Sequence, residues 1–181
     1  MINFFPAKLT TSKSDLVDLN TEYLAWIFRE LNNRYNLEVE LMPLDENFQS
    51  NLRKYVENSL EDLLPSSDSS KSTKLFYLMF ENETLIGMGG LRELSPDVGE
   101  IKRMYVLQKH RKKGYGQEIL QFLIHQGQDL GFSTLRLDTG IFLTTAIHLY
   151  HSAGFYEIEE YPETEIPPEF RPYWLFMEKI L

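Results

Sequence analysis

One short segment constrains this chain more than any other, the run Arg111-Lys-Lys-Gly-Tyr-Gly116 between a predicted strand and a predicted helix. Hydrophobic patterning places the strand over 100–107 and an amphipathic helix over 115–130. A strand, a tight turn and a helix N-terminus together direct several backbone N–H groups at one point, where the helix dipole adds positive potential. Gly114 and Gly116 leave out Cβ atoms where an anion must approach the main chain. The segment therefore predicts a phosphate-binding loop.

The charge and spacing of this segment narrow the kind of phosphate site. The chain carries a formal charge of −9, whereas Arg111, Lys112 and Lys113 form a local cationic block. The segment has neither the Gly-x-x-x-x-Gly-Lys-Ser/Thr spacing of nucleoside triphosphatases nor the Gly-x-Gly-x-x-Gly pattern of dinucleotide-binding folds. A basic triplet before a helix is also typical of ordinary solvated surface, so the downstream sequence has to decide between the two interpretations.

The composition bounds the class of protein. A chain of 181 residues with 43% apolar residues suffices for one hydrophobic core, so we expect a single domain over 1–181. The absence of cysteine excludes disulfides, thiolate metal sites and a cysteine nucleophile. The only histidines at helical spacing, His148 and His151, have no obvious third ligand nearby in the sequence, so no metal site is predicted.

Charge and hydropathy indicate the expected cellular location of the protein and the kinds of partner that it binds. Its 27 acidic residues outnumber its 18 Lys and Arg residues, which disfavours nucleic acid as a partner. No apolar run approaches the roughly 20 residues of a membrane span. The start of the chain lacks the basic region and cleavage site of a signal peptide. We therefore expect a cytoplasmic protein that binds neither nucleic acid nor membrane.

Hydrophobic periodicity and turn residues predict a mixed chain of the α/β class, α+β type. Strands are predicted over 3–9, 75–80, 84–92, 100–107, 133–138, 155–159 and 173–180, and helices over 13–33, 45–63, 115–130 and 144–152. Thr11 or Ser12 is the expected cap of the first helix, and the polar run 65–72 is predicted to be a flexible loop. The order β-α-α-β-β-β-α-β-α-β-β combines hairpins with a crossover, which implies a mixed, mostly antiparallel sheet flanked by helices.

The predicted strand over 100–107 lacks clean alternation, because Lys102 and Arg103 interrupt it. A strand that lines a site and diverges from its neighbour has such a pattern. A partly exposed edge strand has the same pattern, so the sequence leaves both alternatives open.

Three motifs in order resemble the GNAT superfamily of acyl-CoA N-acyltransferases. The first is Glu100-Ile-Lys-Arg-Met-Tyr-Val106 followed by the 111–116 segment, which is similar to the family's Gln/Arg-x-x-Gly-x-Gly/Ala motif after its fourth strand. The second is Leu135-Arg-Leu-Asp-Thr139, on the predicted fifth strand. The third is Ala146-Ile-His-Leu-Tyr-His-Ser-Ala-Gly-Phe155, which resembles the family's Ala-x-x-Leu-Tyr-x-x-x-Gly-Phe. The motifs cover about 75–181, and the first half shares only the strand-helix-helix order.

The resemblance implies a GNAT-like fold and acetyl-CoA, or another acyl-CoA, as co-substrate. It implies that Met104, Tyr105 and Val106 pair with the pantetheine arm and that Arg111, Lys112, Lys113, Gly114, Tyr115 and Gly116 hold the pyrophosphate. The residues themselves agree, since a diverging strand with free N–H and C=O groups is a template for a ligand that contains amides. Leu143 stands where many members carry Asn, so that further CoA contact is not carried over.

The resemblance also implies direct transfer of an acetyl group to a primary amine of a small molecule or peptide. Tyr150 occupies the position of the family's general acid, which protonates the CoA sulfur, although it is also a candidate core aromatic. Glu100 matches the general base of the family's histone acetyltransferases, although it is also a candidate solvated glutamate at a strand start.

The acceptor side is less defined. Asp138 is a further candidate, for holding the amine cation, and its alternative is an exposed aspartate that caps the next turn. Arg103 is expected in the acceptor pocket together with several aromatic and basic residues, namely Tyr23, Trp26, Arg29, Tyr105, Tyr161, Arg171, Tyr173 and Trp174. Two other classes of protein are alternatives to an enzyme. One is a non-catalytic acyl-CoA-binding or regulatory module. The other is a nucleotide-binding domain, which is disfavoured because this sequence lacks the acidic residue expected after the Gly turn. The sequence is compatible with a homodimer.

Overall fold

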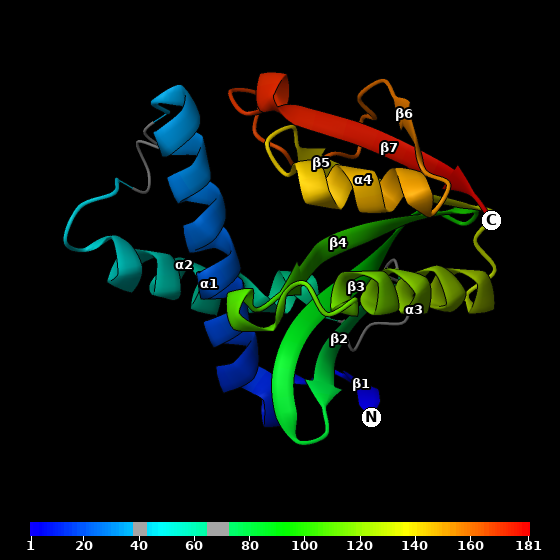
Figure 1. Cartoon of the computed structure of the whole chain (residues 1–181), viewed down its shortest axis with the longest axis horizontal. Coiled ribbons are helices and arrows are strands. Elements are labelled where there is room, and N and C mark those ends of the chain that lie inside the picture. The colour runs from blue at the N-terminus through cyan, green and yellow to red at the C-terminus, as the bar shows by residue number, and fades with distance from the viewer. Residues whose placement is uncertain (38–42, 65–72) are drawn as a thin grey trace.

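The computed structural model describes residues 1–37, 43–64 and 73–181 (Figure 1). Within them, one sheet contains the strands β1 (Ile2–Pro6), β2 (Lys74–Glu81), β3 (Thr84–Ser95), β4 (Val98–Val106), β5 (Thr134–Gly140), β6 (Tyr156–Ile158) and β7 (Trp174–Ile180). The α-helices are α1 (Leu9–Tyr35), α2 (Phe48–Leu63), α3 (Tyr115–Asp129) and α4 (Thr144–Ser152). The spatial order of the strands is β1-β2-β3-β4-β5-β7-β6, and only β4 and β5 pair in parallel. The predicted order of elements and the mixed, mostly antiparallel sheet are confirmed.

Some predicted boundaries at the start of the chain are wrong. The first strand ends at Pro6, and α1 begins already at Leu9. Lys8 occupies the N-cap position without a side-chain cap, so neither Thr11 nor Ser12 caps this helix. The predicted loop over 65–72 lies outside the described residues. None of the described helices is long and apolar enough to cross a bilayer.

Helices cover both faces of the sheet (Figure 1). The apolar run in β2 explains why, since its side chains alternate between the two faces. Tyr77 and Met79 join the cluster that contains the buried side of α3, whereas Phe76 and Leu78 join the cluster that contains α1 and α2. A strand buried on both faces reads as a continuous apolar run, as this one does.

The sheet splits between β4 and β5. These strands pair only over Val98–Ile101 and Thr134–Leu137, although β4 pairs with β3 as far as Val106. Two residues of β4, Arg103 and Met104, lie opposite one residue of β3, which is a β-bulge. Arg103 adopts a left-handed conformation with φ of 49°, so the strand bends at this point. The diverging-strand alternative is therefore confirmed, and the edge-strand alternative is wrong.

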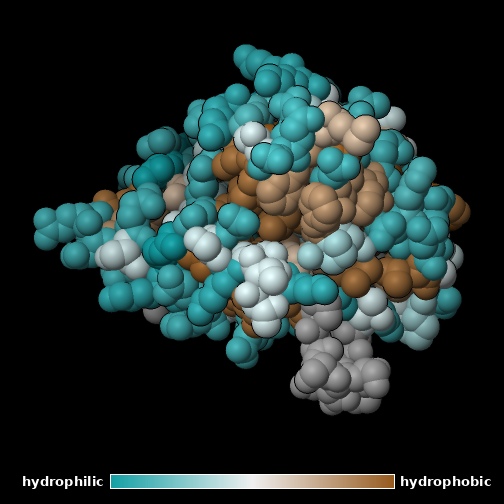
Figure 2. All heavy atoms as spheres, turned by 90° about the horizontal axis from the view of Figure 1, so that it is seen from below, coloured by the Kyte–Doolittle hydropathy of each residue, from teal (hydrophilic) through white to brown (hydrophobic). Residues whose placement is uncertain are grey.

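The strand β1 forms one of the two edges of the sheet. On the face seen in Figure 2, which is the lower side of Figure 1, hydrophobic side chains gather in the middle and hydrophilic ones surround them. In β1, Phe4 stacks on Phe122 of α3 with ring centroids 4.0 Å apart, and Phe5 is 54% exposed. The homodimer stays a prediction.

Candidate active site

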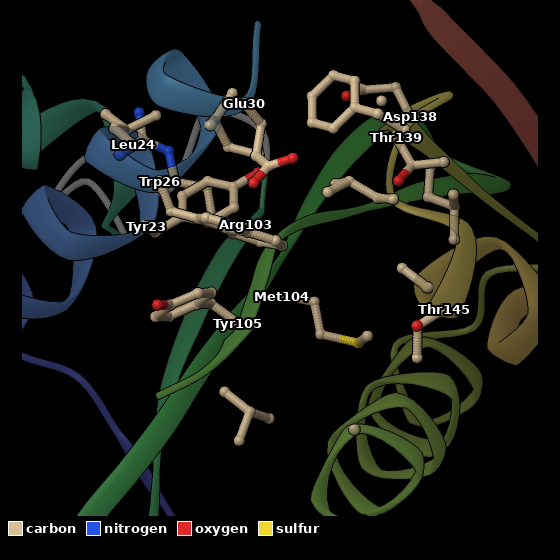
Figure 3. A pocket seen from close by; sticks show the side chains of 18 of the residues that line it. Tyr23, Leu24, Trp26, Glu30, Arg103, Met104, Tyr105, Asp138, Thr139 and Thr145 are labelled. Atoms are coloured by element: carbon tan, nitrogen blue, oxygen red, sulfur yellow. The ribbon is translucent and has the colours of Figure 1, made fainter. Parts of the chain in front are cut away.

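A cavity of about 890 Å³ lies where β4 and β5 diverge. Its walls come from α1, the second half of β4, the 111–117 segment, the end of β5, α4 and the segment before β7. Figure 3 shows side chains of α1 facing those of β5 and α4, with Met104 of β4 between them. The split in the sheet thus brings the predicted cofactor residues and the predicted acceptor residues into one space.

The predicted phosphate loop forms one mouth of this cavity. Within the described chain, the backbone N–H groups of residues 112–116 have no hydrogen-bond acceptor. Lys112 and Gly114 both have positive φ, 63° and 85°, and α3 begins directly afterwards at Tyr115. Apart from Gly114 itself and its two neighbours in the chain, no atom of the described residues would lie within 4 Å of a Cβ atom at Gly114. Unpaired amides around an open concave turn at a helix N-terminus support the predicted anion site, which stays a prediction.

The contacts of Arg111 differ from those expected for a residue that adds positive charge at the approach to the loop. Its Nε donates to the Val106 carbonyl at 3.1 Å, and its guanidinium lies over the ring of Trp26, 4.2 Å from the centroid. Arg111 therefore ties the end of β4 to α1. The exposed cationic charge at the loop comes from Lys112 and Lys113.

The predicted pantetheine-binding residues lie at the split. Beyond Ile101, the edge of β4 that faces β5 has no strand partner among the residues that the structure describes. Met104 and Val106 line the cavity there, whereas the Tyr105 hydroxyl is directed to α1 and donates to Glu22 at 2.8 Å. An unpaired strand edge beside a cavity suits a ligand that pairs through its amides.

Tyr150 reaches the cavity from the end of α4. The side chain is 6% exposed, and its ring packs edge-on against Phe155 with centroids 6.0 Å apart. Its hydroxyl forms no hydrogen bond within the described part of the chain. The alternative was a core tyrosine whose hydroxyl has a hydrogen-bond partner, and the structure does not show such a partner. Burial raises the pKa of Tyr150 above its ordinary value, and the nearby Tyr23 and Asp138 raise it further. The phenol therefore stays protonated and available as a donor, and its catalytic role stays a prediction.

Glu100 is fully buried, with 0% exposure, so the solvated alternative is wrong. Its Oε1 accepts a hydrogen bond from the Tyr161 hydroxyl at 2.6 Å. Its Oε2 lies 2.6 Å from Nη2 of Arg92 and accepts from Nε at 2.9 Å. Glu100 is also not among the described residues that line the cavity. A buried ion pair of this kind is a structural arrangement, and removing one partner leaves the other charge uncompensated. Its role as general base stays a prediction that this geometry does not favour.

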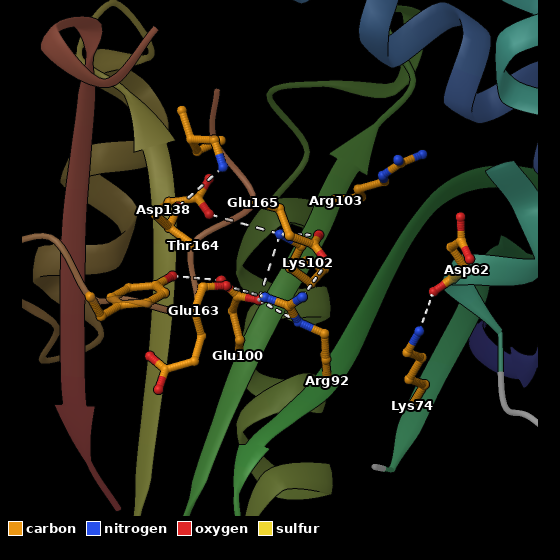
Figure 4. A network of polar contacts seen from close by, with 12 residues as sticks. Asp62, Lys74, Arg92, Glu100, Lys102, Arg103, Asp138, Glu163, Thr164 and Glu165 are labelled. Atoms are coloured by element: carbon orange, nitrogen blue, oxygen red, sulfur yellow. Dashed lines mark hydrogen bonds and ion pairs between the residues drawn. The ribbon is translucent and has the colours of Figure 1, made fainter. Parts of the chain in front are cut away.

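A polar network connects Glu100 to the cavity (Figure 4). Arg92 also pairs with Glu165 and donates to the Glu163 carbonyl at 2.9 Å. Lys102 Nζ lies 3.1 Å from Glu165, 3.5 Å from Glu100 and 3.9 Å from Asp138. Three carboxylates thus share two cations, and the network ties the segment before β7 to the centre of the sheet.

Asp138 is the carboxylate of this network with the longest ion pair, 3.9 Å to Lys102. Its side chain is 12% exposed and lines the cavity, so the exposed turn-capping alternative is wrong. Oδ1 accepts from Trp174 Nε1 at 3.1 Å, whereas Oδ2 has no hydrogen bond within the described chain. Burial raises the pKa of Asp138 to about 6, against the opposing effect of Lys102. Such a carboxylate is ionised at neutral pH but accepts a proton readily.

The other predicted acceptor residues divide into two groups. Tyr23, Trp26, Arg103, Tyr105 and Trp174 line the cavity, whereas Arg29, Tyr161, Arg171 and Tyr173 are not among its described lining residues. The sequence reasoning missed Phe142, Phe170, Glu165 and Lys102 as lining residues. Of these four residues, only Lys102 could have been found from the sequence, because its charge interrupts a predicted strand. Within the described residues, no group of three or more His, Asp or Glu is placed to hold a metal ion.

The raised pKa of Asp138 predicts a pH-dependent gain in stability for Asp138→Asn. Because the folded state binds this proton more tightly than the unfolded state, the wild type loses stability as the pH rises from about 3.8 to about 6. Asparagine keeps the acceptor for Trp174 and removes the charge, so we expect up to about 3 kcal/mol of added stability at pH 7.5. At pH 4 the gain should be small.

Urea unfolding of both proteins at pH 4 and pH 7.5 measures this difference. The control is Asp129→Asn, which removes one carboxylate at the exposed end of α3. An equal gain in that control would show a general effect of net charge. A gain that is the same at both pH values would contradict the buried, raised pKa.

Comparisons with known proteins agree with this arrangement. The sequence profile of the acetyltransferase (GNAT) family matches residues 28–155, more than half of the chain. The uncharacterized N-acetyltransferase YsnE of Bacillus subtilis (strain 168) is 34% identical over 90 residues, which cover 49% of this chain. The match spans 60% of the length of that relative.

Two solved structures resemble the whole chain. The PaiA N-acetyltransferase of Thermoplasma acidophilum, in complex with coenzyme A, has a TM-score of 0.72 at 19% identity and covers 100% of this chain and 99% of its own. A GNAT family acetyltransferase of Elizabethkingia anophelis, with acetyl-CoA bound, has a TM-score of 0.60 at 18% identity and covers 99% and 98%. At these identities the likeness establishes the fold.

Proposed function

We propose that this chain, which belongs to the acetyltransferase (GNAT) family, transfers the acetyl group of acetyl-CoA to a primary amine. The observation that carries the proposal is the shared cavity. Within the described residues, it joins a loop of backbone amides without acceptors, a strand edge without a partner and the hydroxyl of Tyr150. The similar structures with bound coenzyme A and acetyl-CoA support this choice of co-substrate.

The arrangement suggests how the cofactor binds. The pyrophosphate would accept hydrogen bonds from the N–H groups of residues 112–116, with Lys112 and Lys113 adding positive charge at the entrance. The pantetheine arm would pair with the free edge of β4 between Met104 and Val106. This path runs through the split in the sheet and would bring the thioester towards Tyr150.

The chemistry needs no covalent enzyme intermediate. A neutral amine attacks the thioester carbonyl, the C–N bond forms, and a backbone N–H of the free β4 edge would stabilise the oxyanion. The C–S bond then breaks, and the Tyr150 hydroxyl would give its proton to the departing thiolate. The proton that leaves the amide nitrogen restores the phenol.

A second function is a non-catalytic acyl-CoA-binding module, because a fold alone does not decide activity. Both functions require the amide loop and the free strand edge. Only the enzyme requires an acceptor space with a titratable group next to the thioester, and the cavity has one in Asp138. This favours the enzyme.

The first expected result is stabilisation by acetyl-CoA. At a concentration about 100-fold above Kd, a ligand that binds only the folded state adds about 2.7 kcal/mol, which raises Tm by roughly 5–10 °C for a chain of this length. ATP and NAD should raise Tm much less. The measurement is a thermal melt against cofactor concentration, followed by an assay of thiol release with a panel of amines.

The two functions give different results in this pair of assays. A saturable rise in Tm together with amine-dependent thiol release indicates the enzyme. A rise in Tm without thiol release for any amine indicates the binding module. No shift with millimolar acetyl-CoA would contradict both.

A further inference from the structure

We infer that the acceptor is a primary amine with a single positive charge and a compact aromatic or apolar body, whose ammonium binds at Asp138. The body would lie against the aromatic side chains next to this carboxylate. The inference rests on the proposed acetyl transfer, since it assigns the second substrate of the same cavity.

The first support is the charge around Asp138. Lys102 and Glu100 face it from β4, and Glu165 and the phenol of Tyr161 from the segment before β7. The phenols of Tyr23 and Tyr150 approach from α1 and α4. Trp174 of β7 donates to Oδ1. With three carboxylates against two cations, one further cation would neutralise the network. Asp138 Oδ2 has no hydrogen bond within the described chain, so it is the atom that lacks a close donor.

The second support is the state of the other carboxylates along the cavity. Glu30 is held by Arg34 at 2.7 Å. Glu165 lies against Arg92 and Lys102. Among the carboxylates of the described lining residues, only Asp138 has no cation closer than 3.9 Å. A diamine or polyamine would leave its second charge without an unpaired partner, which costs free energy in a partly buried site.

The third support is the surface beside Asp138. The indole of Trp174, which binds Oδ1, packs edge-on against Phe142 with centroids 5.9 Å apart and lies 6.4 Å from Phe170. Tyr23 and Trp26 of α1 line the same cavity. Aromatic rings around a carboxylate suit an ammonium group attached to an apolar body.

A carboxylate on the acceptor fits this place poorly. Arg103, which lines the cavity without a carboxylate partner in the described chain, is directed away from Asp138 (Figure 4). Its Nη1 donates to Asn20 of α1 at 2.8 Å. An α-amino acid would therefore bring its carboxylate next to Asp138 and Glu165, where like charges repel.

Asp138 is also positioned to accept the first proton that the acceptor ammonium loses. An alkylamine with an ordinary pKa near 10 arrives as an ammonium ion at neutral pH. One N–H proton passes to the Asp138 carboxylate, and the freed lone pair forms the C–N bond. The C–S bond breaks as Tyr150 protonates the thiolate, the second N–H proton restores Tyr150, and Asp138 releases its proton to solvent.

Three matched amines test the substrate class. With saturating acetyl-CoA, we expect kcat/KM for 2-phenylethylamine to exceed that for phenylalanine, which adds a carboxylate, and that for 1,4-diaminobutane, which adds a second ammonium, by at least about 10-fold each. A higher value for either competitor would overturn the assignment. Since all three assays use the same bound cofactor, transfer to a competitor would leave the proposed function standing.

The variant Asp138→Asn tests the anchor. We expect kcat/KM for 2-phenylethylamine at pH 7.5 to fall at least about 100-fold while Kd for acetyl-CoA stays the same. The wild type should show a plateau of kcat/KM from about pH 6, the pKa of Asp138, up to the pKa of the amine. The variant should instead rise about tenfold per pH unit over this range, because only the neutral amine then reacts.

Two further variants keep this test specific. Asp129→Asn removes one exposed carboxylate at the end of α3, outside the described lining of the cavity, and should keep the plateau. Asp138→Asn with the wild-type pH profile would overturn the inference. Loss of the plateau in Glu100→Gln alone would overturn it in favour of Glu100. A protein that fails to bind acetyl-CoA would overturn the proposed function and this inference together.

Discussion

The variant Gly114→Val is expected to fold and to lose measurable binding of coenzyme A. Gly114 has a φ of 85°, and apart from its two neighbours in the chain, no atom of the described residues would lie within 4 Å of a Cβ atom there. Gly114 belongs to a turn in which the N–H groups of residues 112–116 have no acceptor within the described chain. An isopropyl group there should keep the pyrophosphate from these amides, so we expect Kd for acetyl-CoA to rise at least about 100-fold. Isothermal titration calorimetry measures the effect.

The chain offers a matched control for this variant. Gly131, beyond the other end of α3, has the same φ of 85° and equally open surroundings. Gly131→Val should lose similar stability, at least the roughly 1–2 kcal/mol of a left-handed residue with a side chain, without loss of affinity. If both variants bound acetyl-CoA equally well, the 111–116 segment would be ordinary surface.

The variant Tyr150→Phe is expected to lose turnover by roughly 10²–10⁴-fold with little change in the affinity for acetyl-CoA. The ring would keep its contact with Phe155, and only the unpartnered hydroxyl would disappear. Single-turnover acetyl transfer over a range of pH is the suitable measurement, since it isolates the chemical step. Raising the pH should not restore activity, because the missing group serves the thiolate and not the amine.

Tyr77→Phe is the control for general effects of removing a buried phenol. Tyr77 is buried like Tyr150, but its hydroxyl donates to Gln126 of α3 at 2.6 Å, and it is not among the described residues that line the cavity. This variant should keep its turnover. Normal single-turnover rates in Tyr150→Phe would reduce Tyr150 to a packing residue.

The structure places the two predicted catalytic residues in different environments. Tyr150 lines the cavity, and its hydroxyl has no partner among the described residues. Glu100 is not among the described lining residues and forms a buried pair with Arg92. The basis for Glu100 was its match to the general base of the family's histone acetyltransferases, and such a match cannot reveal which partners the carboxylate meets in this chain. Arg92 comes from β3 and Tyr161 from the segment before β7, so both partners approach through the fold.

The sequence by itself determined the order of elements, the covered mixed sheet and the loop before α3. These features depend on local patterns: the continuous apolar run of β2, the helical spacing of α3 and the glycine at a left-handed turn. Each pattern acts over a few neighbouring residues, so each can be read from the chain.

Only the tertiary structure decided the acceptor site. Asp138 on β5, Lys102 on β4, Trp174 on β7 and Tyr23 on α1 lie far apart along the chain and meet only because the bulge at Arg103 opens the sheet between β4 and β5. The environment of each charge then follows from burial and from partners on other elements. That is why the sequence presented Asp138 as an exposed turn residue or a weak amine ligand, whereas the fold makes it a buried carboxylate with one unpaired oxygen.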